Sequence, residues 1–195
     1  MAIAFAGKPF ELREILLKDK PHPMLVASPK GTVPVAVLND QLVIEESLEL
    51  MLWALSNNDP QGWLQNLDDS LELIFRNDDE FKYWLDRYKY QVGYPEHSQE
   101  YYRAKAETFL AALENILTGS DFLIASQPRL ADIAIFPFVR QFAFVDKAWF
   151  ESSEYVQTKR WLDYWLDHRL FEAVMEKYQV WENGASPIFF PDTDR

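Results

Sequence analysis

The chain has 195 residues, no cysteine, 48% hydrophobic residues and a formal net charge of −12. The lack of cysteine excludes disulfides, thiolate metal sites and a cysteine nucleophile within this sequence. An acidic surface repels nucleic-acid phosphates and anionic lipid, and no stretch approaches the ~20 apolar residues of a membrane span. We therefore expect a compact cytoplasmic protein of one or two small domains, with neither nucleic acid nor membrane as a partner.

The first fifteen residues predict the end of a helix followed by a strand. The apolar segment from Met1 closes with Gly7, which is typical of the C-terminal stop of a helix. Phe10 to Ile15 then has the composition of a strand. The N-terminal region is thus predicted to be mixed α/β.

A β-hairpin is predicted next. Val33–Pro34 is a candidate cis-proline dipeptide and opens a β-branched run that extends to Leu38. Asn39–Asp40 supplies turn residues that tolerate left-handed backbone, and Leu42–Ile44 returns as the second strand.

A helix is predicted to begin directly after this hairpin. From Ser47 onward, apolar residues recur at helical spacing. Glu46 and Ser47 therefore lie at a helix N-terminus, where free N–H groups and the positive end of the helix dipole attract a carboxylate. This geometry favours the binding of an acidic ligand group.

The remainder of the chain predicts helices. Ser56–Gly62 is a cluster of breaker residues that predicts a linker. Asn77–Asp79 predicts a break, and Gly119 predicts a helix stop. Apolar stripes at helical spacing predict helices near residues 67–75, 81–88, 102–117, 130–144, 156–165 and 171–178.

The Ser-Pro, Val-Pro and Glu-Ser pairs that begin at Ser28, Val33 and Glu46 resemble the glutathione-binding half of the glutathione S-transferase superfamily. The resemblance implies an α/β plus all-α fold. It would consist of an incomplete thioredoxin-like domain in residues 1–56, a linker in 57–62 and an all-helical bundle in 63–195.

The apolar run 130–144 also resembles this family, whose buried central helix usually begins with a Ser/Thr-x-x-Asp capping box. Asp132 matches the acid of that box, whereas Arg129 stands where the hydroxyl residue would be. We interpret Asp132 as structural rather than catalytic.

The resemblance also implies a glutathione site. In the family, a Val-Pro segment such as Val33 and Pro34 offers its backbone to the cysteinyl unit, and a pair such as Glu46 and Ser47 holds the γ-glutamyl end. Lys20 falls near the position where related transferases place a lysine against the glycyl carboxylate. Glutathione would be the co-substrate, an electrophile or a glutathionylated molecule the second substrate, and a two-fold homodimer the assembly.

The first strand and the catalytic turn of the family have no counterpart in this sequence, so we assign no catalytic residue. We expect an N-terminally incomplete chain whose conjugation or thiol-exchange activity is impaired. The alternative is a non-catalytic protein-interaction module with the same fold. Without that strand, we expect Phe10 to Ile15 to shift toward the hairpin, to pair with another chain or to be poorly ordered.

The histidines do not predict a metal site. His22, His97 and His168 lie on separate segments without a neighbouring acidic pattern, which favours surface or hydrogen-bonded histidines.

Overall fold

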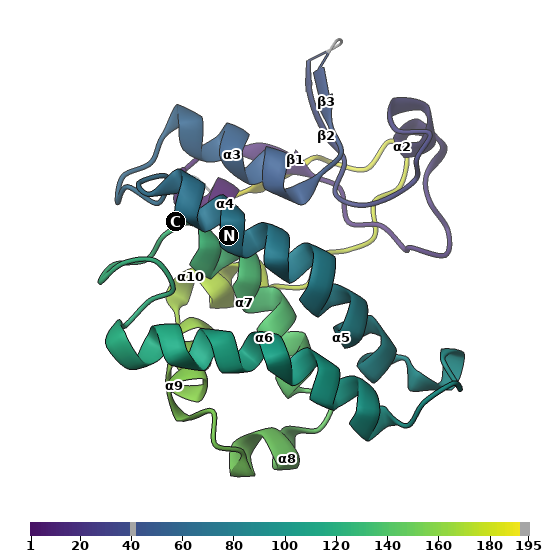
Figure 1. The fold of residues 1–195 in the computed structure, drawn as a ribbon. Coiled ribbons are helices and arrows are strands. Elements are labelled where there is room, and N and C mark those ends of the chain that lie inside the picture. The colour runs from purple at the N-terminus through teal and green to yellow at the C-terminus, as the bar shows by residue number, and fades with distance from the viewer. Residues whose placement is uncertain (40–41, 192–195) are drawn as a thin grey trace. The chain divides into compact units, whose positions relative to one another are not determined.

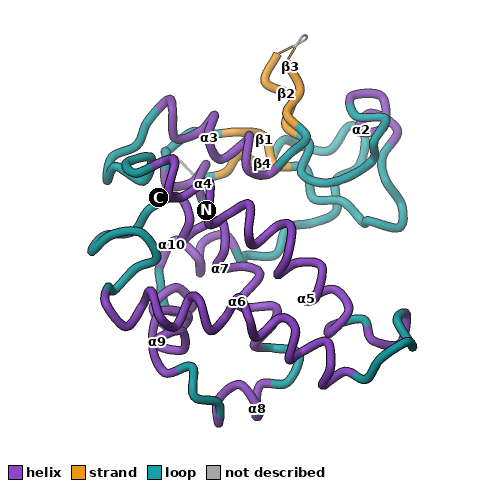
Figure 2. The backbone as a smooth tube through the Cα atoms, in the orientation of Figure 1, coloured by secondary structure: helices purple, strands orange, loops and turns teal. Residues whose placement is uncertain are grey.

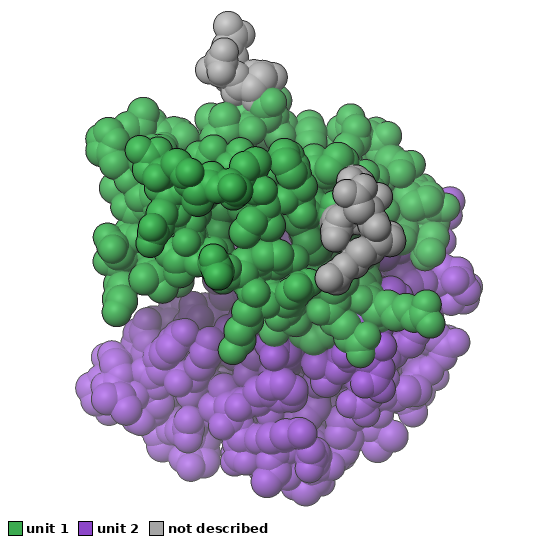
Figure 3. All heavy atoms as spheres, turned by 180° about the vertical axis from the view of Figure 1, so that it is seen from behind, with its two compact units in different colours: residues 1–61, 169–195 green, residues 62–168 purple. Residues whose placement is uncertain are grey.

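The computed structural model describes residues 1–39 and 42–191. The chain forms two compact units, which Figure 3 shows in different colours. Unit 1 contains residues 1–61 and 169–195, and unit 2 contains residues 62–168. The observed division differs from the predicted helical domain of 63–195, because the chain after residue 168 rejoins the first unit and there forms a strand.

Unit 1 is mixed α/β and contains the strands of the described chain, which Figure 2 draws in orange. Its elements in chain order are α1 (Ala2–Phe5), β1 (Phe10–Leu12), α2 (His22–Ala27), β2 (Ala36–Asn39), β3 (Leu42–Ile44), α3 (Ser47–Asn57), α10 (Arg169–Val174) and β4 (Ile188–Phe190), shown in Figure 1. Gly7 has a φ of +62°, a left-handed conformation that suits glycine and ends the α1 region as predicted.

The predicted hairpin and the helix that follows it are confirmed. β2 and β3 pair antiparallel, with Ala36 opposite Ile44 and Val37 opposite Val43. The predicted turn at Asn39–Asp40 extends outside the described residues. α3 begins at Ser47, as the apolar spacing predicted, so Glu46 is the residue that precedes the helix.

Two of the expectations for Phe10 to Ile15, pairing with another chain and poor order, are wrong, because β1 forms within this segment and pairs within its own chain. β1 lies antiparallel to β4, with Phe10 opposite Phe190 and Leu12 opposite Ile188. The backbone N–H of Trp181 also donates to the carbonyl of Glu14 at 2.8 Å. The C-terminal segment thereby supplies the strand partner, and the helix predicted up to residue 178 instead ends at residue 174.

Unit 2 is helical in its described residues. Its elements are α4 (Leu67–Arg76), a π-helical turn (Asn77–Phe81), α5 (Lys82–Lys89), a 3₁₀ turn (Gln91–Gly93), α6 (Gln99–Gly119), α7 (Leu130–Ala143), α8 (Lys147–Ser152) and α9 (Val156–Leu166). No helix in the described part of the chain is both long and apolar enough to span a membrane.

The break predicted at Asn77–Asp79 is absent from this described segment. Arg76, Asn77 and Lys82 keep right-handed helical dihedrals, and the π-helical turn joins α4 to α5 without a loop. Asn77 and Phe81 are buried. The single wider turn of the π-helix keeps the side chains of Asn77 and Phe81 facing the core. The polar residues of this segment suggest a break and do not reveal that the helix continues.

The core of unit 2 centres on α7, the helix predicted near residues 130–144, which is buried nearly all round. Asp132 is fully buried and accepts hydrogen bonds from the backbone N–H of Leu123 (3.0 Å), the backbone N–H of Arg129 (2.9 Å) and Nε1 of Trp161 (2.8 Å). Burial raises the pKa of Asp132 to about 6. Its partners are interior structural groups, in agreement with the structural role predicted for it.

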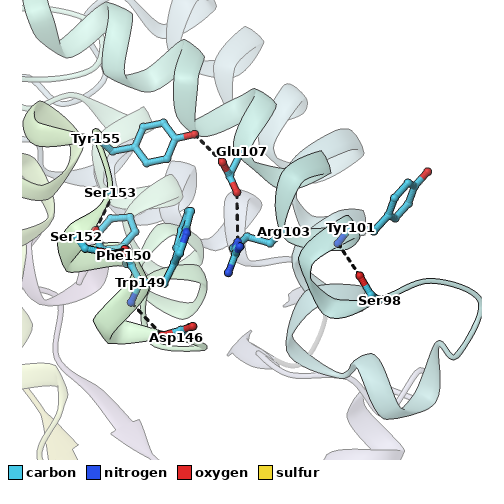
Figure 4. Close-up of polar contacts among 10 residues, drawn as sticks. All are labelled: Ser98, Tyr101, Arg103, Glu107, Asp146, Trp149, Phe150, Ser152, Ser153 and Tyr155. Carbon is cyan, nitrogen blue, oxygen red and sulfur yellow. Dashed lines mark hydrogen bonds and ion pairs between the residues drawn. The ribbon is translucent and has the colours of Figure 1, made fainter.

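A second polar cluster joins α6 to the segment that precedes α9 (Figure 4). Glu107 accepts a hydrogen bond from the Tyr155 hydroxyl at 3.1 Å and pairs with Arg103 at 3.4 Å. The Arg103 guanidinium lies 4.2 Å from the ring centroid of Trp149, and the Asp146 carboxylate caps α8 by accepting from the Trp149 backbone N–H. Burial, followed by the neighbouring Glu107, raises the pKa of Tyr155.

Candidate functional site

The segment between Val33 and Ser47 has the backbone features that the sequence predicted. The Val33–Pro34 peptide bond is cis. Glu46 has extended dihedrals (φ −107°, ψ 136°), and its carbonyl accepts the first hydrogen bond of α3, from Leu50 N–H at 3.0 Å. The amides at the start of α3 precede the first i to i−4 bond, so they are available to an acceptor.

Two side-chain contacts connect the loop before the hairpin to the residues before α3. The buried Ser28 hydroxyl donates to the Glu45 carboxylate, and the exposed Lys30 ammonium pairs with the Glu46 carboxylate. The hydrogen bond with Glu46 raises the pKa of Lys30. These contacts span 16 and 17 residues of sequence and hold the loop against the start of α3.

A cavity of about 310 Å³ in unit 1 brings together two of the predicted site residues, Pro34 and Ser47. Its other walls come from α1, from β1 and the residue Glu14, from α3, and from the C-terminal segment that includes Tyr178 and Phe190. The volume lies in the range of small-molecule sites. Pro34 and Ser47 therefore face one shared space.

The remaining predicted site residues do not line this cavity. Val33 is 49% exposed and lines a second cavity of about 150 Å³, together with Arg13 and Trp181. Glu46 is held in its ion pair with Lys30. Lys20 is half-buried, and its aliphatic chain lies beside Gly31.

Sequence reasoning missed four residues that contribute to this region. Lys30 directly follows the Ser28–Pro29 pair, and Glu45 directly precedes the Glu46–Ser47 pair. Their position next to these motifs was the signal that the sequence offered for both residues. The aromatic residues Tyr178 and Phe190 gave no local signal, because they reach the cavity only through the pairing of β4 with β1.

The histidines lie in separate environments. The His97 ring stacks on Tyr101 with centroids 4.0 Å apart, and the His168 ring lies 5.2 Å from Trp165. Burial lowers the pKa of His168. Within residues 1–39 and 42–191, no three histidine, aspartate or glutamate side chains are arranged as metal ligands.

Comparison with solved structures shows a shared fold. A possible glutathione S-transferase from Rhodopseudomonas palustris is 18% identical, with a TM-score of 0.70 over 93% of this chain and 86% of that chain. A glutathione S-transferase from Xylella fastidiosa is 16% identical, with a TM-score of 0.71 over 88% of each chain. A glutathione S-transferase I bound with lactoylglutathione is 21% identical, with a TM-score of 0.70 over 89% of this chain and 90% of that one.

Family models extend this likeness to the sequence, although no curated protein matches the chain. Residues 1–62 match the glutathione S-transferase N-terminal domain. Residues 61–163, more than half of the 195, match the glutathione S-transferase C-terminal domain. With both domain models matched in order along one chain and the fold shared with solved transferases, the protein belongs to the glutathione S-transferase superfamily.

Proposed function

We propose that this chain binds glutathione at the side of the 310 Å³ cavity where Pro34 and Ser47 meet. The observation that carries the proposal is that the cis-proline and the first residue of α3 line one cavity. The backbone of Val33 would face the cysteinyl unit, and Glu46 with Ser47 would hold the γ-glutamyl end. The structural neighbour bound with lactoylglutathione supports this ligand class.

The charges near α3 suit the two ends of the γ-glutamyl group. A γ-glutamyl α-carboxylate is favoured by the amides and dipole at the start of α3 and by the Lys30 ammonium. Its α-ammonium is favoured by the Glu46 carboxylate. Lys20, beside Gly31, is the proposed and weaker partner of the glycyl carboxylate.

The proposed reaction class is glutathione conjugation to an electrophile, or thiol exchange with a glutathionylated molecule. In this reaction the five residues Val33, Pro34, Glu46, Ser47 and Lys20 would bind and orient glutathione. We assign no catalytic residue. Such interactions raise the rate by holding the thiol close to its target.

Calorimetry tests the binding proposal directly. Each charge-assisted hydrogen bond contributes about 1.5–3 kcal/mol. The double variant Glu46→Ala and Ser47→Ala should therefore abolish measurable binding of glutathione and of S-hexylglutathione. The matched control, Ser56→Ala with Glu72→Ala, removes the same side-chain types at exposed positions outside the cavity lining. Equal affinity in the wild type and the Glu46/Ser47 variant would refute the site.

The assembly and location form part of the same proposal. We propose a cytoplasmic two-fold homodimer, which is the commonest closed arrangement of soluble oligomers. Light scattering at micromolar concentration should give twice the 22.9 kDa chain mass. A constant monomer mass would refute the dimer.

A further inference from the structure

Asn183 differs from the other asparagines of the chain in the residue that follows it. Gly184 comes next, whereas each of the other asparagines precedes a residue with a side chain. The backbone nitrogen of the following residue can attack the carbonyl carbon of an asparagine side chain. A glycine favours this attack, because it has no Cβ to obstruct the approach. The sequence therefore gives Asn183 the most accessible neighbouring nitrogen.

The structure places this dipeptide in an exposed turn between α10 and β4. Asn183, Gly184 and the residues on either side are exposed. Gly184 has a φ of +86°, and a Cβ built on it would meet no atom within 4 Å. The turn is closed by a hydrogen bond from the Ala185 N–H to the Glu182 carbonyl at 3.0 Å. An exposed turn outside helices and strands opens readily, which lets the Asn183 side chain approach the Gly184 nitrogen.

The chain is tied to the same N-terminal region on both sides of this turn. Before it, the Trp181 backbone N–H donates to the Glu14 carbonyl at 2.8 Å, and the Arg13 guanidinium lies 4.7 Å from the Trp181 ring centroid. After it, β4 pairs with β1, with Ile188 opposite Leu12. Because strand register depends on the length of the connection, a change in backbone length at the turn acts on this pairing.

We propose that Asn183 is a site of spontaneous deamidation, and that isoaspartate at this position weakens the pairing of β4 with β1. The Gly184 nitrogen forms a bond to Cγ of Asn183 while the bond from Cγ to the side-chain nitrogen breaks. Ammonia leaves with the proton of the Gly184 nitrogen, and water then opens the succinimide ring. Cleavage of the ring bond between nitrogen and Cγ gives aspartate, and cleavage between nitrogen and the main-chain carbonyl carbon gives isoaspartate.

The two products differ in their effect on the segment. Both replace a neutral amide by a carboxylate beside Glu182, in a chain whose net charge is already −12. Isoaspartate also directs the main chain through Cβ, which adds one carbon atom to the backbone between the two anchored points. The β1–β4 ladder has three residue pairs, so this addition shifts or opens it. Phe190 of β4 lines the 310 Å³ cavity and loses its fixed position with the strand.

Peptide mapping tests the chemical step. The whole protein is incubated at pH 8.5 for several days, and mass spectrometry of its proteolytic peptides measures the conversion of each asparagine. We expect Asn183 to convert about tenfold faster than Asn57 and Asn58, which are also exposed but precede residues with a Cβ. Asn183→Gln should stay unconverted, because its longer side chain would have to close a six-membered ring. Conversion of Asn183 no faster than that of Asn57 would overturn the proposal.

Fresh Asn183→Asp is the matched control for the structural effect, since it carries the new carboxylate without the added backbone carbon. Amide hydrogen exchange at Leu12 and Ile188 should be about tenfold faster in the purified isoaspartate form than in fresh wild type. It should be unchanged in Asn183→Asp, and exchange at Leu110 of unit 2 should be equal in all three forms.

These measurements use no glutathione, so their outcome does not bear on the proposed function. Equal exchange at Leu12 and Ile188 in the isoaspartate form and the fresh wild type would overturn the effect on strand pairing. Equal acceleration in the isoaspartate form and Asn183→Asp would overturn the backbone-length argument and assign the effect to charge.

Discussion

The two units differ in how their structures are held together. In unit 2, large side chains such as Trp63, Phe136 and Trp165 are at most 1% exposed, and they surround a buried polar hub at Asp132. In unit 1, the buried apolar residues are few among those described, and Leu55 and Ile44 are the largest of them. Unit 1 depends instead on pairing between distant segments and retains a cavity. Unit 2 is therefore the more densely buried of the two, whereas unit 1 leaves the space that forms the candidate site.

The largest effect should follow from removal of the polar hub. Asp132→Ala leaves the N–H groups of Leu123, Arg129 and Trp161 without their acceptor. Unpaired buried donors cost about 1–3 kcal/mol each, and relief of the buried charge offsets part of that cost, so we expect a loss of about 3 kcal/mol. Urea denaturation should show it. A loss below 1 kcal/mol would mean that Asp132 does not organise unit 2.

The same residue predicts a pH dependence of stability. Burial raises the pKa of Asp132 from 3.8 to about 6, so between these values the native state binds the proton more tightly than the unfolded chain. Its contribution to the free energy of unfolding should therefore be present below pH 4 and fall by about 2–3 kcal/mol as the pH rises through 6. The measurement is the difference in the free energy of unfolding between the wild type and Asp132→Asn, obtained by urea denaturation from pH 4 to 7. A flat difference would contradict the raised pKa.

A smaller effect is expected from the strand contact in unit 1. Phe10→Ala removes the edge-to-face contact with Phe190 and part of the apolar wall. The loss should be about 1–2 kcal/mol, since an aromatic pair contributes about 0.5–1.5 kcal/mol beyond burial. Amide hydrogen exchange should show faster exchange at Leu12 and Ile188. In unit 2, exchange at Leu110 should stay unchanged as an internal control.

The smallest effect is expected at the exposed ion pair. Lys30→Met removes the partner of Glu46, but both side chains are more than half exposed. The urea midpoint should therefore not change measurably, whereas glutathione affinity should fall about threefold at low salt and converge with the wild type at high salt. A clear fall in stability would show that the contact is structural.

The local elements could be predicted from the amino-acid sequence. The β-branched run from Val33 and the turn residues Asn39–Asp40 predicted the hairpin before α3. The apolar spacing predicted the start of α3 at Ser47, and the apolar run 130–144 predicted the helix α7. Pro34 was recognisable as a candidate cis-proline, and the bond is cis. These features follow from interactions within a few residues, which leave a periodic or compositional signal.

Which distant segments pair could not be predicted from the sequence and follows from the packing of the folded chain. The pairing of Phe10 with Phe190 leaves no local signal, since each three-residue strand is specified by its partner rather than by its own composition. The π-helical turn at Asn77 likewise depends on which side chains the core buries. The distribution of Val33, Pro34 and Ser47 between two cavities also depends on packing between segments remote in sequence, because a cavity is defined by all of its walls together.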